Sequence, residues 1–129
     1  MSRHFSKEEL ACKCCGLMLF DERAYDHLEA LRAVYGGPIP ISSGYRCPSH
    51  NQDVSDSGAN GPHTVYEASN VTVDIPIFGA RAWELVAAAM ILKWPGVGIH
   101  QKGPHSGRMI HLDRCLPADG RPRPTLWSY

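Results

Sequence analysis

The sequence lacks an excess of charge of either sign, a long apolar run and any repeated unit. Its 13 basic and 13 acidic side chains give a formal net charge of zero, whereas nucleic-acid-binding domains normally carry a basic excess or stripe. The longest apolar candidate, residues 85–92, is far shorter than the roughly 18–20 residues of a membrane-spanning helix. Because 43% of the residues are hydrophobic, general disorder is excluded as well. We therefore expect a folded protein without a nucleic-acid or membrane partner.

The length and the first residues set further expectations. A chain of 129 residues favours a single domain over residues 1–129, with a core that buries roughly two thirds of the unfolded surface. The segment from Met1 to Glu8 has no apolar stretch of the kind found in a secretory signal. We therefore expect a protein that is cytoplasmic as synthesised.

Two segments have the spacing of amphipathic helices. The first runs from Asp21 to Tyr35 and ends at Gly36-Gly37, and the second runs from Gly79 to Lys93. A capping box over residues 6–9 predicts a shorter helix before them. The residues expected to point inward on the second long helix are Trp83, Val86, Ala87, Met90 and Ile91.

Strand patterns occupy most of the remaining sequence. Strands are predicted at Pro38–Ser43, Val71–Ile77, Val97–His100 and Arg108–Asp113, and the proline-rich tail after Arg121 is expected to be extended. The alternation places Asn70, Thr72 and Asp74 on one face of their strand. The predicted fold class is α+β, with two main helices packed against a small antiparallel sheet.

Three side chains from distant segments form a candidate metal site: His63, Asp74 and His111. Two imidazoles and one carboxylate are a typical ligand set for catalytic zinc, which keeps its fourth position open. Each residue alone is a weak signal, because a single histidine on a strand is more often a structural residue.

The order of motifs strengthens this hypothesis. Residues 42–51 read Ser-Ser-Gly-Tyr-Arg-Cys-Pro-Ser-His-Asn, and Gly-Val-Gly-Ile-His (96–100) and Ile-His-Leu-Asp (110–113) follow. Together they resemble the zinc D-Ala-D-Ala carboxypeptidase family, which includes phage endolysins and, as distant fold relatives, the hedgehog signalling domains. The resemblance extends from Phe5 to Trp127. It implies a hedgehog/DD-peptidase-like fold with Zn²⁺, hydrolysis of a peptide bond in peptidoglycan stem peptides, a phage or prophage origin and a monomer.

The resemblance also assigns residues. His63 and His111 match the first and last zinc ligands of the family, and Arg46 matches the arginine that faces the substrate carbonyl or carboxylate. The middle ligand departs from the pattern, because Asn70 rather than Asp stands seven residues after His63. Either an insertion of four residues makes Asp74 the ligand, or Asn70 is a poor ligand in a weakened site.

The general base is left open between several residues. Many relatives have an acidic residue three positions before the last histidine, but Arg108 stands there. Asp113, on the same strand face as His111, is either this base or a carboxylate that orients the imidazole. Glu67 is another candidate. The residues expected to contact substrate are Arg46, Trp127 and His105.

The five cysteines admit three interpretations. Cys12, Cys14 and Cys15 lie close together in the sequence, while Cys47 and Cys115 are far from them. In the first interpretation they are buried free thiols, and in the second Cys12 or Cys15 forms a disulfide with Cys47. In the third they bind a second metal ion, although the Cys-x-Cys-Cys spacing of residues 12–15 matches no standard zinc finger. Two alternatives to the peptidase follow: a non-catalytic binding or virion module that keeps the fold, and a structural cysteine–zinc protein.

Overall fold

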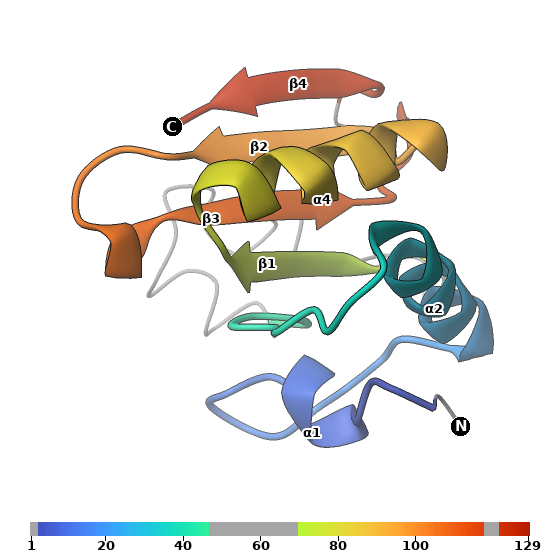
Figure 1. Ribbon diagram of the computed structural model, residues 1–129. Helices are drawn as coiled ribbons and strands as arrows, with labels where there is room; N and C mark the ends of the chain where they lie inside the picture. Colours follow the sequence, from blue (N-terminus) through green and yellow to red (C-terminus); the bar gives the residue numbers. More distant parts are fainter. Residues whose placement is uncertain (1–2, 47–69, 118–121) are drawn as a thin grey trace.

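A computed structural model describes residues 3–46, 70–117 and 122–129 of the chain. It contains three α-helices, one short 3-10 helix and four strands in these residues (Figure 1). The helices are α1 (Lys7–Leu10), α2 (Glu22–Tyr35), α4 (Gly79–Ile91) and η2 (His105–Gly107), and the strands are β1 (Thr72–Pro76), β2 (Gly96–His100), β3 (Met109–Asp113) and β4 (Thr125–Ser128).

The strands form one sheet in the order β1-β3-β2-β4. The pairs β1–β3 and β2–β3 are antiparallel, whereas β4 adds to the free side of β2 in parallel. The α+β class is therefore confirmed, and the antiparallel sheet expected from the sequence gains a fourth, parallel strand. The extended tail supplies this strand.

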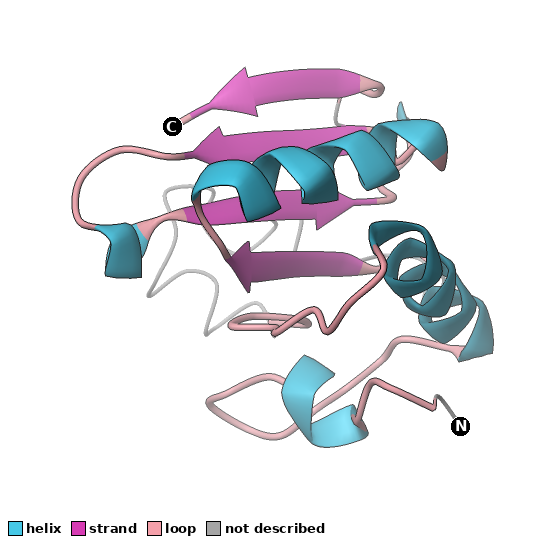
Figure 2. Cartoon of the chain, in the orientation of Figure 1, coloured by secondary structure: helices cyan, strands magenta, loops and turns pink. Residues whose placement is uncertain are grey.

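Alternation along the strands gives the sheet two different faces. One face carries buried aliphatic side chains such as Val73, Ile75, Ile110 and Leu112, which belong to the hydrophobic core. Helix α4 crosses this face, and α2 packs beside α4 (Figure 2). The opposite face carries Asp74, His111 and other polar or aromatic side chains; Asp74 and His111 are buried. None of the described helices covers this face, which we call the open face.

The helix boundaries follow the predicted caps. Ser6 forms the expected capping box with Glu9, and the Asp21 carboxylate accepts a hydrogen bond from the Ala24 amide at the start of α2. Helix α2 ends at Gly36, whose left-handed conformation (φ 85°) is readily adopted only by glycine.

The predicted inward face of α4 is wrong. Trp83 is 75% exposed and Ile91 68% exposed, and Met90 also faces solvent, while Val86 and Ala87 are half-buried. The helix is apolar almost all round, so periodicity alone allows more than one buried stripe. The stripe that packs on the core is rotated by one residue and has mostly small side chains: Ala82, Leu85, Ala88 and Ala89.

The predicted strand at Pro38–Ser43 is also wrong. The segment forms a single β-bridge, between Ser43 and Asp74. Two backbone hydrogen bonds hold it beside β1, from the Ser42 amide to the Asp74 carbonyl (2.9 Å) and from the Asp74 amide to the Ser43 carbonyl (2.8 Å). Pro38 and Pro40 have no N–H to donate, which prevents a longer ladder. The bridge nevertheless brings the following residues, including Arg46, to the middle of β1.

Candidate metal centre on the open face of the sheet

One row of residues crosses all four strands of the open face. Asp74 on β1 pairs with His111 on β3, His111 pairs with Gly98 on β2, and Gly98 pairs with Trp127 on β4. Because directly paired residues point to the same side of a sheet, these side chains meet. The register of the sheet thus assembles residues that are far apart in the sequence.

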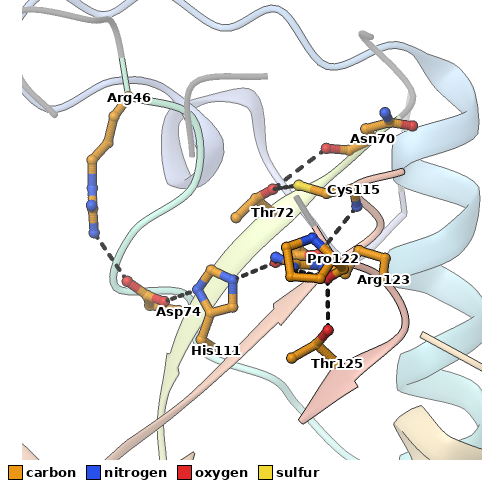
Figure 3. Close-up of polar contacts among 10 residues, drawn as sticks. Arg46, Asn70, Thr72, Asp74, His111, Cys115, Pro122, Arg123 and Thr125 are labelled. Atoms are coloured by element: carbon orange, nitrogen blue, oxygen red, sulfur yellow. Dashed lines mark hydrogen bonds and ion pairs between the residues drawn. The ribbon is translucent and has the colours of Figure 1, made fainter. Parts of the chain in front are cut away.

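Asp74 links a histidine to an arginine. Its Oδ1 lies 2.9 Å from Nδ1 of His111, and its Oδ2 accepts a hydrogen bond from Nη2 of Arg46 at 3.1 Å (Figure 3). The Arg46 Nε–H donates to Oγ of Ser43 at 3.1 Å, so the guanidinium is held from two directions. The β-bridge at Ser43 therefore positions both the arginine and the carboxylate that it contacts.

The second nitrogen of His111 faces a second carboxylate. Nε2 lies 2.8 Å from Oδ2 of Asp113, which is fully buried. Arg123 contacts both oxygens of Asp113, with Nε 2.9 Å from Oδ1 and Nη2 2.7 Å from Oδ2, and the Cys115 amide also donates to Oδ1. Gly96, the partner of Asp113 on β2, makes room, since a Cβ atom there would overlap this carboxylate.

Burial and hydrogen bonds act in opposite directions on the pKa values of Asp113 and His111. Burial alone would raise the pKa of Asp113, but hydrogen bonds from His111 and Arg123 outweigh it and hold that pKa well below its usual value. Burial likewise opposes protonation of His111, yet the contacts with Asp113 and Asp74 raise the pKa of its imidazole above 6.5. Both shifts favour the charged form of the group, the carboxylate of Asp113 and the imidazolium of His111.

Trp127 forms an aromatic wall next to the histidine. Its ring centroid lies 5.2 Å from that of His111, and the guanidinium of Arg123 lies 5.1 Å from the indole centroid. Gly98 makes this approach feasible, because a Cβ atom there would come within 2.6 Å of the indole. Trp127 therefore lies beside the candidate ligand, and the substrate contact expected for it stays a prediction.

The structure brings together most, but not all, of the residues selected from the sequence. Arg46, Asp74, His111, Asp113 and Trp127 form one cluster. His63 and Glu67 lie outside the described residues. His105 lies on the exposed η2, where its ring stacks on Phe78 with centroids 4.3 Å apart.

Asn70, the alternative middle ligand, lies apart from the Asp74–His111 contact. It precedes β1, and its backbone carbonyl accepts a hydrogen bond from Thr72 Oγ1 at 3.5 Å. Figure 3 shows it near Cys115, away from the imidazole. Of the two candidates, only Asp74 is paired with His111 in the sheet register.

Sequence reasoning assigned no role in the site to three residues that shape it: Arg123 and the motif glycines Gly96 and Gly98. The signal for the glycines was present, because two glycines two positions apart in a strand leave one face without side chains and often mark a close approach. Nothing in the tail sequence shows that Arg123 returns to the sheet, since this depends on how β4 pairs with β2.

The cluster combines an imidazole and a carboxylate that converge, a buried carboxylate behind the imidazole, and a fixed guanidinium; groups of these kinds occur in metal-dependent hydrolases. The family model described as Peptidase M15 matches residues 3–113, a range that includes Arg46, Asp74, His111 and Asp113. The chain therefore belongs to the peptidase M15 family. The resemblance recognised from the motifs is confirmed, and membership supports a metallopeptidase.

The other comparisons add no relatives. Neither the search of curated proteins nor the search of solved structures gave a match. In the described part of the chain, no helix has the length and apolar character required to cross a membrane.

Proposed function

We propose that the protein is a zinc peptidase that hydrolyses a peptide bond in bacterial peptidoglycan stem peptides. The observation that carries the proposal is the convergence of Asp74 Oδ1 and His111 Nδ1 within 2.9 Å, with Arg46 on the other oxygen of Asp74. Family membership supports peptidase chemistry, and the motif resemblance supplies the substrate class.

The donor atoms suit zinc. Imidazole nitrogen and carboxylate oxygen are both common ligands at about 2.0–2.2 Å, which puts two ligands of a tetrahedral ion about 3.3 Å apart. The 2.9 Å contact between Asp74 and His111 therefore needs to open by only a few tenths of an ångström. We assign Asp74 and His111 as ligands, with His63 as the third on the family pattern. When bound, zinc supplies a Lewis acid that makes water nucleophilic at neutral pH.

Of the two roles expected for Asp113, the geometry favours orientation of the imidazole. Its oxygens already accept hydrogen bonds from His111, Arg123 and the Cys115 amide, and the residue has no exposed surface. By accepting from Nε2–H, Asp113 fixes the His111 tautomer that presents Nδ1 as a ligand. Glu67 stays a prediction for the proton acceptor.

Arg46 is placed to act on the substrate. Its guanidinium is anchored beside Asp74 by Ser43, so a substrate carbonyl next to the metal ligands would meet a fixed positive charge. A preorganised donor of this kind stabilises the oxyanion that develops during hydrolysis, an effect of about 10²–10³ in rate. Trp127 provides an apolar surface beside the same position.

The proposal is tested with purified peptidoglycan as the substrate. Zinc content is measured by elemental analysis and released products are identified by mass, with and without a chelator, for wild type, Asp74→Ala and Asn70→Ala. We expect cleavage that stops with chelator, returns with zinc and is lost in Asp74→Ala together with one zinc ion per chain, while Asn70→Ala keeps the wild-type zinc content. The exposed Asp26 on α2 offers a matched control, Asp26→Asn. Cleavage that persists in Asp74→Ala or in chelator would refute the proposal.

A non-catalytic module is the second candidate. It is favoured by Arg108, because many relatives have an acidic residue at this position, three residues before the last histidine. Arg108 instead donates its Nε–H to the Gly103 carbonyl (3.0 Å). Zinc binding with no product of any mass would support this candidate. The masses of the products also show which stem-peptide bond is cut. The phage or prophage origin, the cytoplasmic synthesis and the monomeric state stay predictions.

A further inference from the structure

A second set of metal-binding atoms lies in the loop after α1, far in the sequence from the cluster on the sheet. The Sγ atoms of Cys12, Cys14 and Cys15 all lie within 4.8 Å of one another, and those of Cys12 and Cys14 are 3.5 Å apart. Cys12 is buried, while Cys14 and Cys15 are exposed. One side of the group therefore faces the protein and the other faces solvent.

The backbone of the loop gathers the thiols. The Gly16 amide donates to the Cys12 carbonyl (2.8 Å), and the Cys12 amide donates to the Leu17 carbonyl (2.7 Å), which closes a tight turn over residues 12–17. Gly16 has a φ of 77°, a left-handed conformation that side chains disfavour. Cys12 and Cys15 also have the Cys-x₂-Cys spacing common in zinc sites.

We propose that this loop binds a second zinc ion through the three cysteine thiolates. Thiolates about 2.3 Å from a tetrahedral zinc ion are about 3.8 Å apart. The Sγ atoms of Cys12 and Cys14 are 3.5 Å apart and no pair in the group is farther apart than 4.8 Å, so small side-chain movements would bring all three to this separation. An all-sulfur set selects softer ions than the imidazole and carboxylate set of the sheet. The two sites therefore differ in chemistry as well as in position.

The ion would support the segment that holds Arg46. The Tyr45 amide donates to the Leu10 carbonyl (2.8 Å), and Gly44 lies so close to the Leu10 backbone that a Cβ atom would come within 2.6 Å of its carbonyl oxygen. Phe20, just after the loop, packs edge-on against the Tyr45 ring, with centroids 6.1 Å apart. Because metal binding and local folding are coupled, an ion in the cysteine loop would stabilise both flanks of this contact.

The test uses cobalt as a spectroscopic probe in the reduced, metal-free protein. Sulfur-to-cobalt charge-transfer absorption reports thiolate ligands and is not produced by imidazole or carboxylate ligands. We expect this absorption in wild type and in Asp74→Ala, and its loss in the double variant Cys14→Ser/Cys15→Ser. Both cysteines are exposed, so their replacement leaves the core unchanged. Cys115→Ser, a buried cysteine away from the loop, is the control.

Two measurements test the second metal site independently of the proposed peptidase activity. The double variant is expected to lose a zinc ion by elemental analysis and to unfold at a lower temperature in zinc, while it still cleaves peptidoglycan. Absence of the charge-transfer band in reduced wild type, or its persistence in the double variant, would overturn the second site whatever the outcome for activity. Loss of cleavage in Asp74→Ala, with the charge-transfer band unchanged, would support both proposals.

Discussion

The contact between Asp113 and Arg123 allows a quantitative test of how the site is held. In Asp113→Asn the side chain keeps its shape but loses its charge and one acceptor oxygen. The carboxylate accepts from Arg123, His111 and the Cys115 amide, so the amide NH₂ must face at least one donor whichever way it turns. The Arg123 side chain is only 6% exposed, and the substitution removes the carboxylate that balances its charge.

The magnitude follows from this burial. Removing one partner of a buried ion pair costs about 3–5 kcal/mol, because the remaining charge is uncompensated. The entropy of unfolding scales with length at about 2.1 cal/mol/K per residue, which makes about 0.27 kcal/mol/K for this chain, so a loss of 3 kcal/mol lowers Tm by about 11 °C. Thermal and urea unfolding of the reduced, metal-free protein measure it, and the exposed control Asp26→Asn should change stability by less than about 0.5 kcal/mol.

A double substitution separates the ion pair from other effects. Asp113→Asn combined with Arg123→Met should cost less than the sum of the two single changes, since no buried charge is left unpaired. Asp113→Asn should also weaken zinc binding by about 10–100-fold if the carboxylate orients His111. A loss of stability below about 1 kcal/mol for Asp113→Asn, or strict additivity of the two changes, would refute the reasoning.

Three further outcomes are expected. Arg46→Ala should reduce the rate of peptidoglycan cleavage by about 10²–10³ while zinc content stays unchanged; an unaltered rate would remove Arg46 from the mechanism. Gly98→Ala should displace the indole of Trp127 and destabilise the protein by about 1–3 kcal/mol in urea unfolding, and an unchanged midpoint would contradict the close approach. Burial and the charge of Arg114 lower the pKa of His27 below 6.5, so the unfolded state takes up the proton first as pH falls. The free energy of unfolding of the wild type should therefore decrease as pH falls from about 6.5 through the pKa of His27 in the folded state. The same change of pH should lower the free energy of unfolding of His27→Gln by less, which unfolding experiments at several pH values measure.

Local patterns predicted much of the candidate site. Alternation correctly placed Thr72 and Asp74 on one face of their strand and His111 and Asp113 on one face of theirs, and the strand pairing puts both sets on the same side of the sheet. The order of motifs indicated the family, which the match over residues 3–113 confirms. These signals are local, because they depend on strand periodicity and on short segments of sequence.

The packing of helix α4 and the pairing of the segment near residue 40 could not be predicted from local sequence patterns. The apolar helix α4 offered several stripes of similar hydrophobicity, and close packing on the sheet selected the one rich in alanine rather than the one with Trp83 and Ile91. The prolines near residue 40 reduced a predicted strand to one bridge, yet that bridge is what places Arg46 at Asp74.

The sequence by itself determined the α+β class, the helix caps, the face of each strand and the residue types for metal chemistry, since each of these depends on neighbours within a few positions. Only the tertiary structure decided that Asp74 pairs with His111, and that the tail returns as β4 to bring Arg123 and Trp127 beside it. The reason is that strand register is a long-range property. It is set by the burial of one whole face of the sheet and by the room that Gly96 and Gly98 leave on the other.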